Sequence, residues 1–128
     1  MHGLITEEWG DGVYSFRIGW GQWKELDELL QIGPVPLLKR FLYNEWRVAD
    51  VREVIRVALI GGGATPVQAI KLVKLYVEDR PITENAGLAS RILSGAMFIP
   101  EGSSLGKAEA TPKVETDSIS KSPLETLQ

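Results

Sequence analysis

Hydrophobic and polar residues alternate near the start of the chain with the two-residue period of a β-strand. Tyr14, Phe16 and Ile18 are separated by smaller or polar residues, so their side chains would share one face of a strand. The Gly-Asp-Gly sequence at residues 10–12 directly before them is typical of a tight turn. The pattern therefore predicts a strand over residues 13–18 that follows a turn.

The partner of this strand is expected to be residues 5–9, which would complete an N-terminal β-hairpin. An isolated hairpin is marginally stable in water. We therefore expect Trp9, Phe16 and Trp20 to pack on the helices that follow.

The period changes to that of an α-helix after Gly21. A first helix is predicted to end at Gly33 and Pro34, because Gly is favoured just after a helix and Pro cannot continue it. A second, shorter helix is predicted to end near Asn44. The apolar positions that define the two helices are Trp23, Leu26, Leu29 and Leu30 in the first, and Leu37, Leu38, Phe41 and Leu42 in the second.

A third helix has the strongest sequence signals, with Asp50 predicted as its N-cap and Glu53 at the capping-box position. Three glycines at residues 61–63 are predicted to end it. Its apolar face is formed by residues at helical spacing, namely Val51, Val54, Ile55, Ala58 and Leu59.

The next helix is predicted to begin at Thr65 as N-cap, with Pro66 as its first residue, and to extend to about Glu78. A break at Arg80 and Pro81 separates it from a last helix that ends before Pro100. The apolar faces of the two helices comprise Ile70, Val73 and Val77, and Leu88, Ile92, Leu93, Ala96 and Met97.

These elements predict a mostly helical α+β fold, an N-terminal hairpin followed by about five short helices, in a single domain over residues 1–100. Residues 101–128 contain five Ser, three Thr and two Pro but no aromatic residue, whereas all ten aromatic residues lie between Trp9 and Phe98. This composition is typical of a disordered tail or of a segment that folds on binding.

The composition excludes most kinds of catalytic site. The chain has 128 residues, no Cys and one His, His2, which lies beside the initial Met. Metal sites with cysteine ligands and cysteine nucleophiles are therefore excluded. A histidine at a terminus is poorly placed to act as a base or metal ligand. We expect no enzyme activity, no catalytic residue, no metal and no cofactor.

The net charge of −3 does not favour binding to nucleic acid or to an anionic membrane. There is no signal-peptide pattern and no apolar run long enough to span a bilayer. We therefore expect a cytoplasmic protein of the producing cell, with no membrane or nucleic acid among its partners.

Two local patterns resemble ligand-binding motifs. The glycines at 61–63 before a helix resemble a phosphate-binding loop, but they follow a helix and lack the Lys-Ser/Thr pair, so capping explains them better. The two flanking helices resemble a helix-turn-helix with Lys71 and Lys74 on its second helix. Two lysines are weak support, and a solvated helix surface is favoured.

Acidic residues at 7–8, 25–28 and 78–79 are interpreted as surface charge rather than as catalytic carboxylates, because they lie at element ends or on polar faces. The four tryptophans are more informative, since Trp is enriched both in small cores and at interface hot spots. The candidate partner-binding residues are Trp9, Phe16, Trp20, Trp23 and Trp46.

An ordered series of short motifs resembles a family found in gene transfer agents and in related long-tailed phages and prophages. The resemblance covers roughly residues 7–99. It rests on FRIGWGQWKEL at 16–26, GP at 33–34, WRVADVRE at 46–53, LIGGG at 59–63 and RP at 80–81. Members are described as tail tube proteins or as tail assembly chaperones, which hold the tape-measure protein in solution while tube subunits polymerise around it.

The resemblance implies a non-enzymatic role in tail morphogenesis. Tail tube rings are built mainly from β-sandwich-like subunits, so the helical pattern of this chain favours a tail assembly chaperone. Its expected partners are the tape-measure protein and tail tube subunits, and homo-oligomerisation is a further expectation. The residues after 100 resemble the extension by which a longer, frameshifted form of such chaperones contacts the tape measure. The alternatives are a structural tail tube component, located in the virion tail, and a helix-turn-helix nucleic-acid-binding module.

Overall fold

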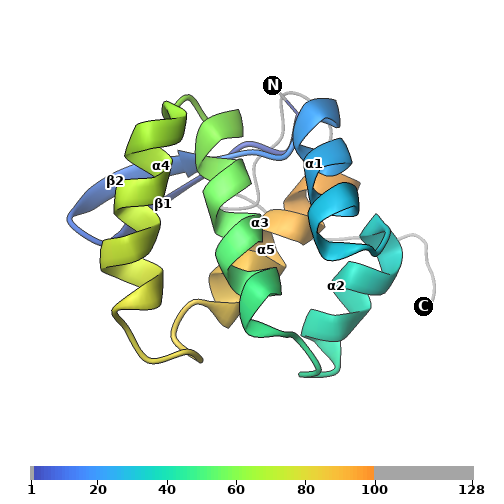
Figure 1. Cartoon of the computed structure of the whole chain (residues 1–128). Coiled ribbons are helices and arrows are strands. Elements are labelled where there is room, and N and C mark those ends of the chain that lie inside the picture. Colours follow the sequence, from blue (N-terminus) through green and yellow to red (C-terminus); the bar gives the residue numbers. More distant parts are fainter. Residues whose placement is uncertain (1, 100–128) are drawn as a thin grey trace, which may run out of the picture.

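A computed structural model of the chain describes residues 2–99, in which a β-hairpin precedes five α-helices (Figure 1). The elements are β1 (Ile5–Trp9), β2 (Gly12–Phe16), α1 (Trp20–Leu30), α2 (Pro34–Leu42), α3 (Val48–Gly61), α4 (Pro66–Val73), the π-helical turn η1 (Lys74–Glu78) and α5 (Ala86–Phe98). The predicted mostly helical α+β class is confirmed. The expected disordered tail, residues 101–128, lies outside the described residues.

The hairpin has the predicted partners. β1 and β2 are antiparallel, Ile5 pairs with Phe16, and the turn between the strands contains Gly10 in the left-handed region with φ of 61°. β2 ends at Phe16, two residues earlier than predicted. Its continuation leaves the sheet because the Arg17 N–H donates to the Ala58 carbonyl oxygen of α3 at 3.0 Å.

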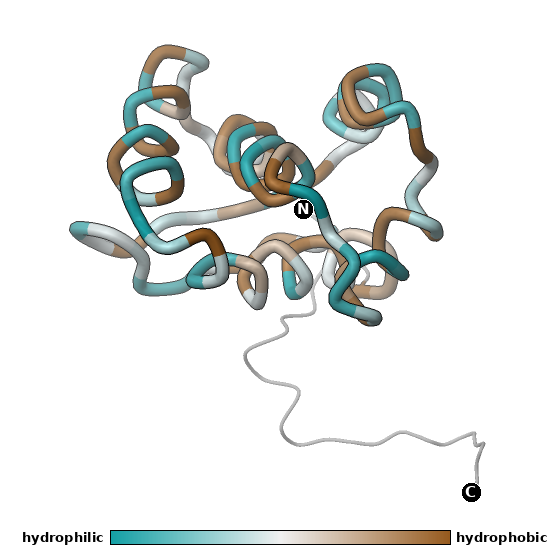
Figure 2. Tube along the Cα trace, turned by 60° about the horizontal axis from the view of Figure 1, so that its bottom comes forward, coloured by the Kyte–Doolittle hydropathy of each residue, from teal (hydrophilic) through white to brown (hydrophobic). Residues whose placement is uncertain are grey.

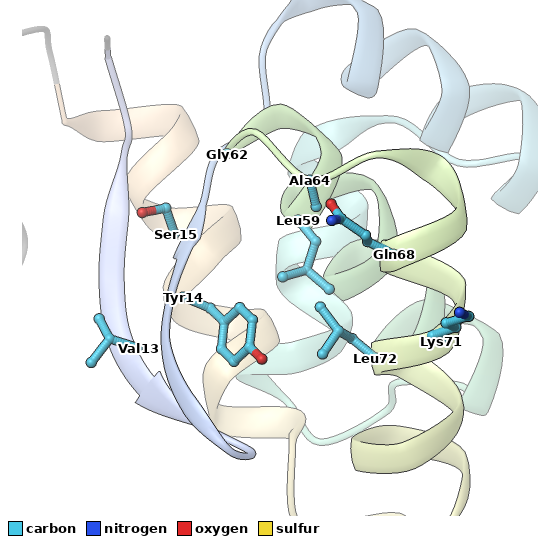
Figure 3. A pocket seen from close by; sticks show the side chains of 9 residues that line it. All are labelled: Val13, Tyr14, Ser15, Leu59, Gly62, Ala64, Gln68, Lys71 and Leu72. Atoms are coloured by element: carbon cyan, nitrogen blue, oxygen red, sulfur yellow. The ribbon is translucent and has the colours of Figure 1, made fainter.

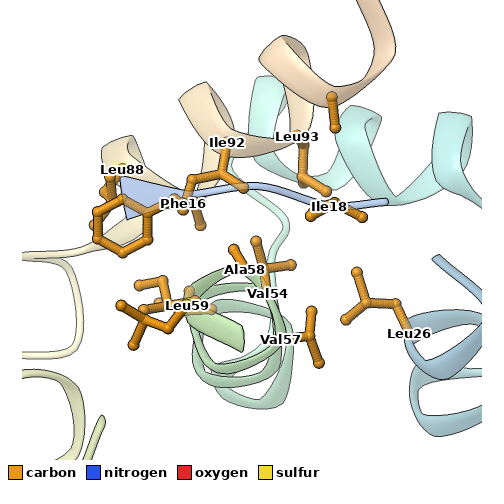
Figure 4. Close-up of a cluster of buried hydrophobic side chains, with 14 of the residues drawn as sticks. Phe16, Ile18, Leu26, Val54, Val57, Ala58, Leu59, Leu88, Ile92 and Leu93 are labelled. Carbon is orange, nitrogen blue, oxygen red and sulfur yellow. The ribbon is translucent and has the colours of Figure 1, made fainter. Parts of the chain in front are cut away.

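Helix α3 is the centre of the domain. It contacts α1, α4, α5 and β2, and its residues Val54, Ile55, Val57, Ala58 and Leu59 are all buried. In Figure 4 the side chains of the segment containing Phe16 and Ile18 lie between α3 and α5. The hairpin is therefore stabilised by packing between two helices, and the expectation that Phe16 packs on the helices is confirmed.

Several apolar residues of the predicted helix faces are exposed. Figure 2 shows hydrophobic and hydrophilic residues within each turn of the helices, as expected for amphipathic elements. Trp20, however, is 81% exposed, so the prediction that it packs on the helices is wrong. Leu29, Leu42 and Ile70 are exposed as well. The sequence period places Leu29, Leu42 and Ile70 on apolar faces, but no element among residues 2–99 covers these positions.

Helix α1 begins and ends earlier than predicted. Its N-cap is Gly19, whose N–H donates to Gln22 Oε1 at 2.9 Å. At its other end Gln31, with φ of 56°, adopts the left-handed conformation that was predicted for Gly33. Gly33 instead caps the start of α2, where Pro34 is the first residue.

The N-cap predicted for α3 is also wrong, whereas that for α4 is confirmed. Arg47 is the N-cap of α3, and Asp50 is the third helical residue, whose carboxylate accepts the Arg47 N–H at 2.7 Å. In α4, Gln68 donates its N–H to Thr65 Oγ1 at 3.1 Å, and Thr65 donates its N–H to Gln68 Oε1 at 2.9 Å. This helix continues through η1 to Glu78, as predicted.

Candidate partner-binding site

Two of the five candidate aromatic residues belong to the interior. Phe16 is fully buried and Trp9 is partly buried against the core. The Trp9 ring makes edge-to-face contacts with Tyr14, Phe16 and Tyr76 at centroid distances of 5.5–5.7 Å. Both side chains are therefore engaged in holding the hairpin on the helices.

Trp9 also anchors a buried polar link that sequence reasoning missed. Its indole N–H donates to Asn85 Oδ1 at 2.9 Å, and Asn85 Nδ2 donates to the Tyr76 carbonyl oxygen at 2.7 Å. Asn85 is buried and is the N-cap of α5, but its side chain makes no capping bond. An Asn before a helix is ordinarily interpreted as a cap, so its sequence position gave no signal of a link to the hairpin.

Trp20 and Trp23 lie on α1 beside a surface hollow, which we call the aromatic groove. It is about 460 Å³ in volume and opens between α1, the start of α2 and the end of α5. Its lining residues are Trp20, Trp23, Lys24, Asp27, Pro34 and Met97. The fold thus brings two of the predicted aromatic residues together with residues from two other helices.

The aromatic groove combines apolar side chains with two charged ones. Trp20 is largely exposed and Trp23 half-buried, so the first ring is available to a partner while the second joins the groove to the core. Lys24 and Asp27 place one positive and one negative charge among apolar side chains. Such a groove suits an apolar segment with charged flanks.

Trp46 does not join this groove. It lies in the connection between α2 and α3, where it is partly buried and packs against the core.

A second groove separates the hairpin from α4 (Figure 3). It is about 430 Å³ in volume, and its lining includes Val13, Tyr14, Leu72 and Lys71. The Tyr14 hydroxyl donates to the Asp11 carboxylate, and this hydrogen bond, with some burial and the negative charge of Asp11, raises the pKa of Tyr14 to about 12. The phenol therefore stays neutral at physiological pH.

The glycine-rich turn has the geometry of a helix end. Gly62 is the C-cap of α3, and its N–H donates to the Ala58 carbonyl oxygen at 2.9 Å. Lys71 on α4 and Lys74 at the start of η1 are exposed beside the apolar residues Val67 and Ile70. Of the Arg, Asn and Gln side chains with which a recognition helix reads bases, α4 contains only Gln68, whose amide oxygen accepts the Thr65 N–H at 2.9 Å.

Acidic residues in each of the three predicted surface groups form ion pairs with arginines. Glu7 accepts two hydrogen bonds from Arg91 at 2.7 and 2.8 Å, and this interaction raises the pKa of Arg91. Glu25 pairs with Arg56 and Glu78 pairs with Arg52, each at 2.6 Å. These carboxylates connect separate elements at the surface. Within residues 2–99, no cluster of three or more His, Cys, Asp or Glu residues could hold a metal ion.

Comparison with known protein families identifies the domain. A model of the family described as "Phage tail tube protein, GTA-gp10" matches residues 2–98. The chain belongs to this family. The match covers most of the chain, and it confirms the resemblance to gene transfer agent and phage tail proteins that the sequence motifs indicated. No match was found among curated proteins or among solved structures.

Membership of the GTA-gp10 family makes this chain a phage or gene transfer agent tail protein. In the part of the chain that the structure describes, no helix is long and apolar enough to cross a membrane. The family match ends at residue 98, which is also the last residue of α5. The matched region therefore corresponds to the hairpin and the five helices, including the aromatic groove.

Proposed function

We propose that this member of the GTA-gp10 family is a non-enzymatic tail assembly chaperone that binds the tape-measure protein in the aromatic groove. The observation that carries the proposal is the exposure of Trp20 beside the hollow formed with Trp23, Pro34 and Met97. An exposed tryptophan at the edge of an apolar groove is unfavourable in water. Covering it with an apolar partner makes it a strong contributor to binding.

The groove suits an amphipathic helix. A tape-measure protein is a long amphipathic helix whose apolar residues recur at positions i, i+3 and i+4, and a groove between helices accepts such a set of anchors. Lys24 and Asp27 would contact the polar residues beside the apolar anchors. A chaperone that covers this stripe would keep the tape-measure protein in solution until tube subunits replace it.

The alternative role is that of a structural tail tube subunit, which the description of the family supports. Against it, the described residues contain one sheet of two strands, and five helices form the rest of the domain. Tail tube rings are built mainly from β-sandwich-like subunits. The helical fold therefore supports the chaperone role.

Co-expression with the tape-measure protein of the same gene cluster tests the proposal. We expect the wild-type chain to raise the soluble fraction of the tape-measure protein and to co-purify with it. Trp20→Ala should weaken the complex about tenfold or more, because it removes a large aromatic anchor. The exposure of Trp20 predicts little change in the free energy of unfolding.

Tyr43→Ala is the matched control. Tyr43 is an exposed aromatic residue that follows α2 at the end opposite Pro34, so its loss should leave binding unchanged. Equal effects of both variants, or no complex with the wild-type chain, would contradict the proposal. Mass spectrometry of purified particles separates the two roles, since a tube subunit is abundant in particles and a chaperone is present only in unassembled lysate.

A further inference from the structure

The described part of the chain ends at the aromatic groove. Met97 lines the groove, and the next residue, Phe98, ends α5 and is 69% exposed. Residues 100–128 continue from this point. Any binding element in the first part of that segment is thus joined by only a few residues to Met97, which lines the groove together with Trp20 and Trp23.

The nearest apolar residue in the segment is within reach of the whole groove. Leu105 is the first large apolar residue after Ile99 and follows Met97 by eight residues. An extended chain of that length spans at most about 26–29 Å. A short tether of this kind holds its end at an effective concentration in the millimolar range, so a weak contact suffices for substantial occupancy.

The charges around Leu105 complement those of the groove. Glu101 and Lys107 flank the leucine, one negative and one positive. The groove contains Lys24 and Asp27. Each charged group of the segment therefore has an opposite charge available at the groove, with the apolar side chain between them.

We propose that residues 101–107 of the same chain dock in the aromatic groove, with Leu105 against Trp20 and Trp23. Docking covers the exposed indole of Trp20 when no partner is bound. The segment then competes with any partner for the same apolar surface, and partner binding releases it. This regulatory consequence rests on the proposed function, whereas docking itself does not.

A spin label tests the docking in the full-length chain without a partner. The chain has no Cys, so Ser103→Cys provides a single attachment site next to Leu105. We expect the label to broaden the indole N–H signals of Trp20 and Trp23 in the NMR spectrum. The Trp9 indole is the internal reference, because it lies at the turn end of the hairpin, which Figure 1 shows on the opposite side of the domain from α1.

Two variants separate docking from mere proximity of the tether. Adding Leu105→Ser to the labelled chain should restore most of the Trp20 signal, while Leu127→Ser, a matched change far along the segment, should leave it broadened. A label at Ser122→Cys should broaden Trp20 much less. If Leu105→Ser and Leu127→Ser give the same Trp20 intensity, or if Trp20 is broadened no more than Trp9, the docking proposal is wrong.

Measurements of tape-measure binding then test whether the docked segment competes with this partner. Leu105→Ser should bind the tape-measure protein more tightly than the wild-type chain does, because the competing segment is lost. Broadening at Trp20 without any tape-measure binding would overturn the proposed function and leave docking intact. Tape-measure binding without broadening would overturn docking alone.

Discussion

Gly61 and Gly62 lie against the end of the hairpin so closely that neither position has room for a side chain. A Cβ atom added at Gly62 would be 2.2 Å from the Ser15 carbonyl oxygen, and one at Gly61 would be 2.0 Å from that of Arg17. Both contacts involve backbone, which cannot rotate away as a side chain can. Capping accounts for the end of α3, but only this close approach explains why two glycines are needed there.

We predict that Gly62→Ala lowers the free energy of unfolding by about 1–3 kcal/mol or more, because the methyl group forces β2 away from α3. Gly21→Ala is the matched control. Gly21 lies within α1 with no atom near its added Cβ, so alanine there should stabilise the protein by about 0.5–1 kcal/mol. Urea denaturation followed by circular dichroism measures both. A loss no larger for Gly62→Ala than for Gly21→Ala would contradict the packing argument.

Residue type alone predicts the candidate binding residues only in part. Aromatic type alone selected Trp9, Phe16, Trp20, Trp23 and Trp46, and the fold places only Trp20 and Trp23 at one groove. Phe16 and Trp9 hold the hairpin instead. An aromatic side chain is favourable in a core and at an interface for the same reason, the large apolar area that it buries, so residue type cannot separate the two roles.

At the scale of elements, the connection between α2 and α3 depends on one buried carboxylate. Asp50 is 1% exposed, accepts the Arg47 N–H at the start of α3, and receives hydrogen bonds from Arg40 of α2 at 2.9 and 3.1 Å. A single side chain thus accepts a backbone N–H at the start of α3 and also links α3 to α2. The capping prediction assigned Asp50 the wrong helical position, because the pairing with Arg40 is not local in sequence.

We predict that Asp50→Ala lowers the free energy of unfolding by about 1.5–3 kcal/mol, since it removes hydrogen bonds to a charged partner and leaves the Arg47 N–H without its acceptor. Asp50→Asn should cost less, because its amide oxygen can still accept from Arg47. Arg80→Ala, which removes an exposed ion pair with Glu84, should change stability by less than about 1 kcal/mol. Thermal and urea unfolding measure the series, and a loss for Arg80→Ala as large as that for Asp50→Ala would refute this ranking.

Helix boundaries were predicted with mixed success for a physical reason. The capping box of Thr65 and Gln68 is a reciprocal pair of local hydrogen bonds, so a stretch of four residues specifies it. The end of α1 at Gln31 is different, because the left-handed conformation is adopted there by a residue that only weakly favours it. Which residue adopts this conformation depends on how the next helix packs, and the local sequence does not show it.

At the scale of the whole molecule, charge argues against nucleic-acid binding. The chain carries a net charge of −3, and five of its arginines, Arg40, Arg52, Arg56, Arg80 and Arg91, are held in ion pairs. Lys71 on α4 and Lys74 on η1 are exposed, but the apolar residues Val67 and Ile70 lie beside them. A surface of this kind offers few phosphate contacts.

We therefore predict no retardation of a random DNA duplex in a gel-shift titration at low salt, where even non-specific binding is strongest. A basic DNA-binding domain run beside it serves as the positive control. Retardation that Lys71→Glu and Lys74→Glu abolish would instead support the helix-turn-helix alternative.

The sequence by itself determined the hairpin, the order and type of the helices, the Thr65 cap and the family resemblance, because these depend on local hydrogen bonds and on periodic patterns within single elements. Only the tertiary structure decided that Trp20 remains exposed while Phe16 is buried, that Asp50 joins α2 to α3, and that Met97 meets Trp23 at one groove. These facts depend on which faces meet across elements far apart in the chain. A helix pattern specifies an apolar face, but the neighbour that packs on it determines how much of that face is covered.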